Sequence, residues 1–210
     1  MTFTNNNLRR FLIVIAAACV FQSCNLIRLI NTTESRDESK EEINEFLEKH
    51  RYNYDYSVCS VDSTYASFSN EKNNIYITTS DFITAIQLRV YEPSGNLYSA
   101  YSQCGGDFKK NRNITAVPPP LNQNPNINTA LKLSDELDLL ELSDIQRQEI
   151  IEKSKSHPYT FVVHWAIWTN YFSENVLQDI SRLKRKYPKD VLVILVNVGN
   201  SRVGINGKRS

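Results

Sequence analysis

The residues with the most distinctive chemistry in this chain are its four cysteines, Cys19, Cys24, Cys59 and Cys104. A thiolate can attack a disulfide, and its reactivity depends on a lowered thiol pKa, which a C-x-x-C pair at a helix N-terminus provides. None of the four cysteines stands in that spacing. The roles of these thiols must therefore be inferred from their surroundings in the sequence.

The other residue types that commonly build active sites form no recognisable pattern. His50, His157 and His164 lack the H-E-x-x-H spacing and have no neighbouring cysteines, so the sequence predicts no metal site. The G-x-S-x-G, P-loop and dinucleotide-binding motifs do not occur, and we expect no cofactor. The net charge of +1 provides no basic footprint for nucleic acid. Hydrolytic, nucleotide-dependent and nucleic-acid-binding functions are left without support.

Residues 1–24 have the pattern of an export signal. Arg9 and Arg10 end a polar segment, and the apolar run 11–21 that follows is too short to cross a bilayer as a helix. The alternative is an uncleaved anchor, because apolar residues continue beyond the run, but the charge of Arg28 argues against a full span. We therefore expect a signal peptide.

Cys24 stands where this signal would be cut. The segment Val20 to Cys24 resembles, loosely, the cleavage site of bacterial lipoproteins, in which the cysteine becomes the lipid-bearing N-terminus. Cleavage before Cys19 would shorten the apolar segment, which makes it the less favoured alternative. The resemblance implies a lipid anchor on Cys24 that attaches the chain to a membrane of a bacterial cell envelope, on the periplasmic side or at the cell surface.

Cys59 and Cys104 would then be the only thiols left, and three arrangements are open to them. Exported proteins commonly join such a pair, and in the chain-entropy model a bridge across a loop of this length stabilises the fold by roughly 4 kcal/mol. The second arrangement is two free buried thiols. The third is a redox-active pair, because Gly105 and Gly106 place a permissive backbone beside Cys104.

The rest of the chain divides into a tether and one domain. Residues 25–42 are mostly polar and charged and are expected to be flexible, whereas 43–210 has the composition of a single folded domain. Ser39 and Glu42 fit a capping box, which predicts a short helix that ends near Arg51.

The first half of the domain has the character of antiparallel β-structure. Strand-like residues fill much of 52–104, and the most distinct hairpin joins 82–91 to 97–101 through a turn at 92–96. The later expected elements are an irregular connection over 105–128, a short helix capped by Ser134, and a helix capped by Ser143 that ends near Lys155.

The domain is expected to be organised around a strand, a helix and a second strand. Residues 159–168 and 191–198 are apolar on both faces, as in strands that are covered on both sides of a parallel sheet. The apolar stripe from Val176 to Tyr187 predicts a helix between them, with Ser173 as its N-cap. Such a crossover makes the two strands parallel. His164, inside the first run, is expected to be buried and hydrogen-bonded.

The end of the first run resembles the start of a thioredoxin-like domain of the membrane-anchored thiol-disulfide oxidoreductase type. The first core strand of that family typically ends in F-W-A-x-W-C-x-x-C, and Trp165, Ala166 and Trp168 match this pattern. Thr169 and Phe172 occupy the positions of the two cysteines. Threonine supplies no thiolate at neutral pH and phenylalanine has no sulfur, so the resemblance implies that the redox site is degenerate.

The positions of the degenerate motif are Trp168, Thr169, Asn170, Tyr171 and Phe172. The sequence also departs from the family after the second strand. Thioredoxin-like domains continue after the second strand with a helix, a cis-proline loop and a closing hairpin, whereas a Gly-rich basic segment follows here. We therefore expect an α/β fold, α+β overall, with a partial thioredoxin-like βαβ unit preceded by an antiparallel hairpin region. Other strands of the chain or a protein partner would cover the open sheet edge, unless the sequence is a truncated gene product.

These inferences favour a membrane-anchored lipoprotein whose degenerate domain is a non-catalytic binding or assembly module, with 168–172 as its contact surface. The alternative is a thiol-disulfide oxidoreductase that uses Cys59 and Cys104 in place of the missing motif.

Overall fold

The computed structural model describes residues 38–60, 86–102, 116–121 and 131–199. Contacts within the chain divide it into two units, residues 1–32 and 33–210, and every described residue belongs to the second unit. Cys24, Cys104 and most of the expected irregular connection lie outside the described residues. No helix in the described ranges is both long and apolar enough to cross a membrane.

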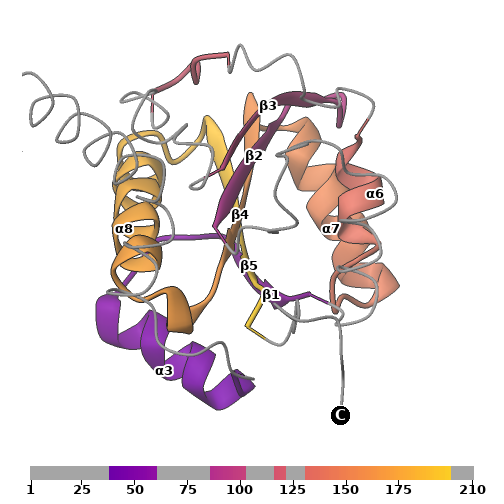
Figure 1. Ribbon diagram of the computed structural model, residues 1–210. Coiled ribbons are helices and arrows are strands. Elements are labelled where there is room, and N and C mark those ends of the chain that lie inside the picture. Colours follow the sequence, from indigo (N-terminus) through magenta and orange to yellow (C-terminus); the bar gives the residue numbers. More distant parts are fainter. Residues whose placement is uncertain (1–37, 61–85, 103–115, 122–130, 200–210) are drawn as a thin grey trace, which may run out of the picture. The chain divides into compact units, whose positions relative to one another are not determined.

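The described strands form a mixed five-stranded sheet in the order β1-β5-β4-β2-β3 (Figure 1). β1, β5 and β4 are parallel, and β2 and β3 extend the sheet antiparallel beside β4. This arrangement confirms the expected α/β class. The strands are β1 (Tyr56–Cys59), β2 (Gln87–Tyr91), β3 (Leu97–Ser102), β4 (Tyr159–Trp165) and β5 (Val191–Asn197).

The crossover from β4 to β5 is confirmed, with corrections at its first turn. The two strands pair in parallel from Tyr159 opposite Val191 to Trp165 opposite Asn197. β4 stops at Trp165, before a short 3-10 turn, η2 (Ile167–Thr169), and helix α8 (Tyr171–Lys186). The predicted N-cap at Ser173 is wrong, because the helix begins two residues earlier and Asn170 is its N-cap.

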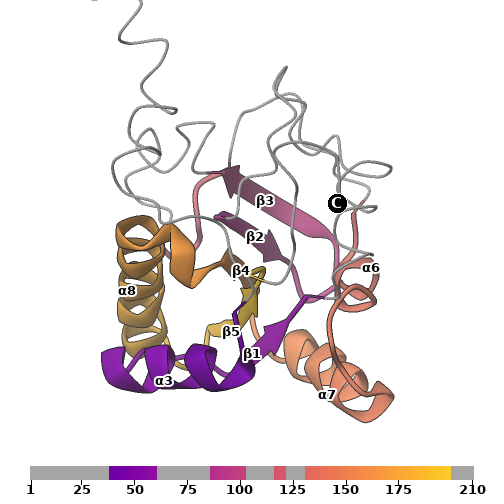
Figure 2. The ribbon, with the colours of Figure 1, turned by 60° about the horizontal axis from the view of Figure 1, so that its bottom comes forward.

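The edges of the crossover are covered by strands from elsewhere in this chain. The expected hairpin β2–β3 is confirmed, and β2 pairs with β4 along its whole length (Figure 2). β1 was expected among antiparallel strands, but it pairs in parallel with β5 at the other side of the sheet. Each strand of the crossover therefore has a neighbour on both sides, and the outer edges of the described sheet are β1 and β3.

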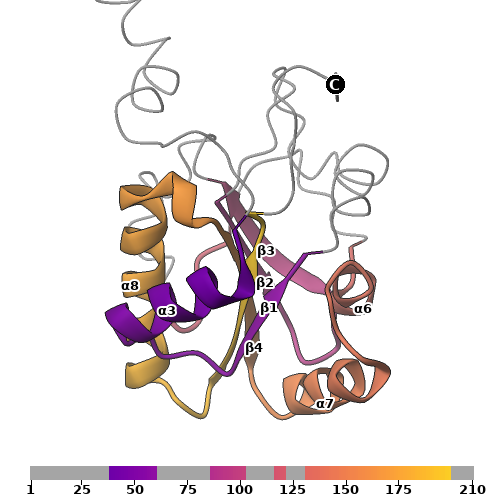
Figure 3. The same ribbon diagram turned by 90° about the horizontal axis from the view of Figure 1, so that it is seen from below.

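Helices cover both faces of the sheet (Figure 3). On one face, α3 (Lys40–His50) and α8 bury their apolar stripes against the side chains of alternate strand residues. On the other, α6 (Leu133–Leu137) and α7 (Asp144–Lys155) do the same. This double cover explains why β4 and β5 are apolar on both sides, as the sequence predicted.

The helix caps agree with the sequence at two of the four predicted positions, Ser173 being one of the two that differ. Ser39 and Ser143 both form the expected capping boxes, each accepting a backbone N–H three residues later. Ser134 is not a cap, because α6 begins at Leu133 with Lys132 as its N-cap. A serine inside an acidic, leucine-rich stretch was therefore an insufficient signal for the start of this short helix.

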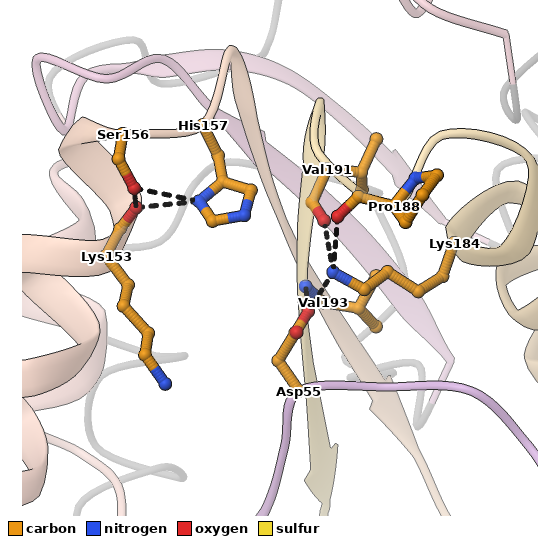
Figure 4. A network of polar contacts seen from close by, with 8 residues as sticks. All are labelled: Asp55, Lys153, Ser156, His157, Lys184, Pro188, Val191 and Val193. Carbon is orange, nitrogen blue, oxygen red and sulfur yellow. Dashed lines mark hydrogen bonds and ion pairs between the residues drawn. The ribbon is translucent and has the colours of Figure 1, made fainter.

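Polar contacts join the residue before β1 to the first residues of β5 (Figure 4). The Asp55 carboxylate accepts the Val193 N–H at 2.8 Å and lies 2.7 Å from the Lys184 ammonium. Lys184, near the end of α8, also donates to the carbonyls of Val191 at 2.8 Å and Pro188 at 3.2 Å. These contacts set the register at which the parallel strand β1 begins.

Candidate functional site

The segment 168–172 lies at the carboxyl ends of the parallel strands β4 and β5. This is the edge at which open α/β sheets bind their ligands. Trp165 and Asn197 end the two strands side by side, and η2 and the start of α8 follow directly. Because the strand ends and the helix start meet here, a motif at this position can combine backbone and side-chain groups from several elements.

Thr169 is buried within a small hydroxyl cluster. Its Oγ1 lies 2.7 Å from the Ala166 carbonyl oxygen and 2.5 Å from Ser173 Oγ. Ser173 Oγ is 2.9 Å from the same carbonyl and accepts the Ala166 N–H at 3.3 Å. Each hydroxyl carries one proton, so one donates to the carbonyl while the other donates to its neighbour. The Thr169 hydroxyl therefore ties η2 to α8.

The next three residues lie nearer the surface than Thr169: Asn170 and Tyr171 are exposed, and Phe172 is half-buried. Asn170 has a φ of 45°, in the left-handed region that asparagine tolerates better than most residues. Phe172, at the second cysteine position, is half-buried and packs against the core of the α3 and α8 face. Tyr171 is 58% exposed, and its ring meets Phe172 edge-on at 5.9 Å. Tyr171 and Phe172 thus form an aromatic surface at the start of α8.

The hydroxyl cluster gives a prediction for stability. Thr169→Val keeps the shape of the side chain but removes its hydrogen bonds, which should lower the free energy of unfolding by about 1 kcal/mol. Urea denaturation followed by circular dichroism measures this change. Thr169→Ser, which keeps the hydroxyl, is the control and should lose less. Equal stability of Thr169→Val and the unaltered chain would show that the cluster does not hold η2 in place.

Glu38 also reaches this site, although sequence reasoning placed it in the flexible tether. Its carboxylate is 1% exposed. Oε1 accepts the Trp168 N–H at 2.8 Å, and Oε2 accepts Asn197 Nδ2 at 2.7 Å. The only sequence signal was the capping box that begins at Ser39, the next residue. Residues 38–42 therefore belong to the folded unit.

Cys59, one of the two thiols predicted to remain, lies on β1 and is buried with a free thiol. Burial raises its pKa above the ordinary thiol value, and the negative charge of Glu141 adds to this effect, against a smaller opposing effect of Lys40. A raised pKa keeps the sulfur in the unreactive thiol form. Because Cys104 lies outside the described residues, a bridge between the two cysteines stays a prediction.

A second polar group, which we call the buried cluster, lies between the sheet and α6. Arg89 donates to Glu136 Oε1 and to Gln87 Oε1, both at 2.7 Å. The Tyr91 hydroxyl donates to Glu136 Oε2, and His164 Nε2 lies 3.0 Å from Glu136 Oε1. All five side chains are buried. The expected burial of His164 is confirmed, but sequence reasoning missed the carboxylate and guanidinium that it faces.

The electrostatics of the buried cluster favour an ionised Glu136 and a neutral His164. Burial alone would raise the pKa of Glu136, but the Arg89 charge, His164 and the Tyr91 hydroxyl together lower it to about 2. Burial and the Arg89 charge lower the pKa of His164, against the opposing effect of Glu136. Because these groups lie inside the core beneath α6, we assign the cluster to stability rather than to substrate chemistry.

The described ranges hold no group of three or more His, Cys, Asp or Glu residues that could bind a metal ion.

The candidate site consists of the hydroxyl cluster, the Glu38 carboxylate and the aromatic surface around Tyr171. Searches of family models, curated proteins and solved structures found no match to this chain.

Proposed function

We propose that this chain is a membrane-anchored lipoprotein of a bacterial envelope and that its degenerate thioredoxin-like domain is a non-catalytic binding or assembly module. The observation that carries this proposal is the state of Thr169. Its hydroxyl stands where the family has the attacking thiol, but it is buried and engaged with Ala166 and Ser173. A group held in this way stabilises the turn and is not presented to a substrate disulfide.

The arrangement of the sheet supports the likeness to the thioredoxin-like family. That family places a closing hairpin after its second parallel strand. In this chain the hairpin β2–β3 comes earlier in the sequence, yet β2 pairs antiparallel with β4. A hairpin supplied from the N-terminal side therefore takes the place beside β4.

The contact surface that we propose is the aromatic segment 168–172. Tyrosine, tryptophan and phenylalanine are enriched in protein interfaces because they bury a large area at a small entropic cost. Tyr171 is among the large hydrophobic side chains that the described surface exposes, and half-buried Trp168 and Phe172 flank it in the sequence. A partner at the sheet edge would have to pair with β1 or β3, because β4 and β5 have neighbours on both sides.

The first test is disulfide reduction. The mature protein, cleaved before Cys24, should leave insulin disulfides intact under conditions in which a dithiol oxidoreductase reduces them. The rival function, an oxidoreductase that uses Cys59 and Cys104, predicts activity that Cys104→Ser abolishes. Such a loss would overturn our proposal. The buried, high-pKa thiol of Cys59 argues against this outcome.

The second test is partner capture. Tyr171→Ser should weaken chemical crosslinking of the chain to its neighbours in intact envelopes, because it removes the most exposed ring of the proposed surface. Tyr54→Ser is the matched control, since Tyr54 is also exposed but lies in the connection before β1. Identical crosslinking by both variants would contradict the assignment of the surface. Mass spectrometry of the mature N-terminus tests the lipid on Cys24.

A further inference from the structure

The buried carboxylate of Glu38 sits in a site built from three separate segments. The Trp168 N–H comes from η2, the Asn197 side chain from the end of β5, and Gly199 from the residues after it. Asn197 is itself oriented, because its Oδ1 accepts the Gly199 N–H at 2.9 Å. This bond turns the amide nitrogen of Asn197 toward the carboxylate. We call this group of donors and the glycine beside them the carboxylate cradle.

Gly199 shapes the cradle by the absence of a side chain. A Cβ added at this position would lie 2.4 Å from both Cδ and Oε2 of Glu38. Atoms that are not bonded cannot approach so closely, so any other residue here would displace the carboxylate. The cradle therefore combines two aimed donors with a surface that only glycine leaves open.

A buried carboxylate is costly unless hydrogen bonds replace its water. The cradle replaces that water on both oxygens, one with a backbone donor and one with a side-chain donor. Charge-assisted bonds of this kind are short and strong, and the distances of 2.8 and 2.7 Å fit that description. The site is thus chemically suited to a carboxylate.

We propose that the carboxylate cradle is a binding site for the carboxylate of a partner peptide and that Glu38 occupies it from within the same chain. Glu38 precedes α3, whose first residue is Lys40, so its withdrawal leaves the helix and its capping box intact. The cradle also lies at the carboxyl ends of β4 and β5, where α/β sheets bind ligands. The inference rests on the proposed binding function and names the chemistry that the partner presents.

The test removes the internal ligand and supplies a free one. Glu38→Ala deletes Cγ and the carboxylate, which together have the size of acetate. The full-length chain in detergent is titrated with sodium acetate, and sodium chloride at equal ionic strength is the control. Trp165 and Trp168 are the only tryptophans in the chain, so intrinsic fluorescence reports on this region. Glu38→Ala should bind acetate at least about tenfold more tightly than the unaltered chain, in which the cradle is filled.

A double variant makes the test specific to the cradle. In Glu38→Ala/Gly199→Ala, the new Cβ at position 199 occupies the space of the carboxylate, so acetate binding should disappear. Glu45→Ala, which removes an exposed glutamate of α3, should behave as the unaltered chain. Acetate binding that persists in the double variant, or that also appears in Glu45→Ala, would overturn the inference.

The inference can also be tested if Glu38→Ala is less stable than the unaltered chain. A ligand that binds only the folded state raises the unfolding midpoint, so acetate but not chloride should raise it for this variant. No difference between the two salts would overturn the inference. Glu38→Gln gives a second measurement, because an amide cannot accept on both sides. It should lower the unfolding midpoint, and a midpoint equal to that of the unaltered chain would show that the cradle does not select a carboxylate.

Two further probes distinguish the sources of the carboxylate. In the α-amide of N-acetylglutamate the only carboxylate is that of the side chain. In N-acetylglycine the only carboxylate is that of the chain terminus. Binding of either to Glu38→Ala supports the inference and identifies the source, and binding of neither would overturn it for peptides. Such a failure would leave the proposed function standing, because that proposal is decided by disulfide reduction and by crosslinking of the Tyr171→Ser variant.

Discussion

Replacement of Glu136 by alanine should lower the free energy of unfolding by about 3 to 5 kcal/mol, the usual result when one partner of a buried ion pair is removed. Glu136 and Arg89 are 1% and 3% exposed, and their charged atoms lie 2.7 Å apart. The variant keeps the guanidinium in the core but removes the carboxylate opposite it. Tyr91 and His164 lose the same acceptor, which adds to the cost.

Urea denaturation followed by circular dichroism measures the loss, and a surface pair beside the same helix is the control. Asp138 lies 3.4 Å from Arg147 and its side chain is 63% exposed. Asp138→Asn should therefore cost less than about 1 kcal/mol. A loss for Glu136→Ala as small as that of Asp138→Asn would contradict the role that we assign to the buried cluster.

A double variant removes both charges of the ion pair and keeps apolar side chains in their place. In Arg89→Met/Glu136→Leu both charges are replaced by apolar groups of similar length, and such replacements are often neutral or stabilising. We expect the double variant to be more stable than Glu136→Ala. If it is not, the destabilisation of Glu136→Ala comes from the acceptor that Tyr91 and His164 lose and not from the unpaired charge of Arg89.

The elements that the sequence predicted well are those that their own residues determine. β4 and β5 are apolar on both faces because helices cover both sides of the sheet, and that pattern needs no knowledge of the partners. The capping box at Ser39 is likewise local, since its two hydrogen bonds join residues three apart. The hairpin β2–β3 follows from a turn sequence between two strand-like runs.

The features that the sequence did not predict depend on residues far apart in the chain. Strand propensity identified β1, but it contains no information about which strand lies beside it. The hairpin prediction identified β2, but nothing local showed that α6 would cover the side of the strand that carries Arg89. Glu38 looked like part of a solvated tether, because its donors Trp168 and Asn197 lie more than a hundred residues away.

The resemblance to a redox motif located the candidate site but not its chemistry. It aligned Thr169 and Phe172 with the two cysteines, and the structure has Thr169 in η2, after β4, and Phe172 in the first turn of α8. It did not indicate that Ser173 would complete a hydroxyl cluster with Thr169. A substitution pattern shows which chemistry is missing, whereas hydrogen-bond geometry is needed to show what replaces it.

Acidification should destabilise the fold in two steps, one for His164 and one for Glu136. In the folded chain His164 stays neutral and Glu136 stays ionised at pH values at which the unfolded chain already binds a proton at each residue. The pKa of His164 lies below its ordinary value of 6.5, so the unfolded chain takes up a proton there first, and stability falls as the pH drops below about 6.5. The pKa of Glu136 falls from its ordinary value of 4.5 to about 2, so its contribution is complete above about 4.5 and is lost as the pH falls toward 2.

Urea denaturation at a series of pH values between 7.5 and 2 measures both steps, with about 3 kcal/mol expected from Glu136 over the full lower range. His164→Gln separates the two. It removes the imidazole, so the unfolding free energy of this variant should stay nearly constant between about pH 6.5 and 5 and should fall only in the range of the carboxylates. His157→Gln is the matched control, because His157 is only partly buried and follows the end of α7, where it contacts the Lys153 carbonyl (Figure 4). A profile for His164→Gln that follows that of His157→Gln at every pH would show that His164 does not titrate with folding, and the pH dependence would then have to arise outside the buried cluster.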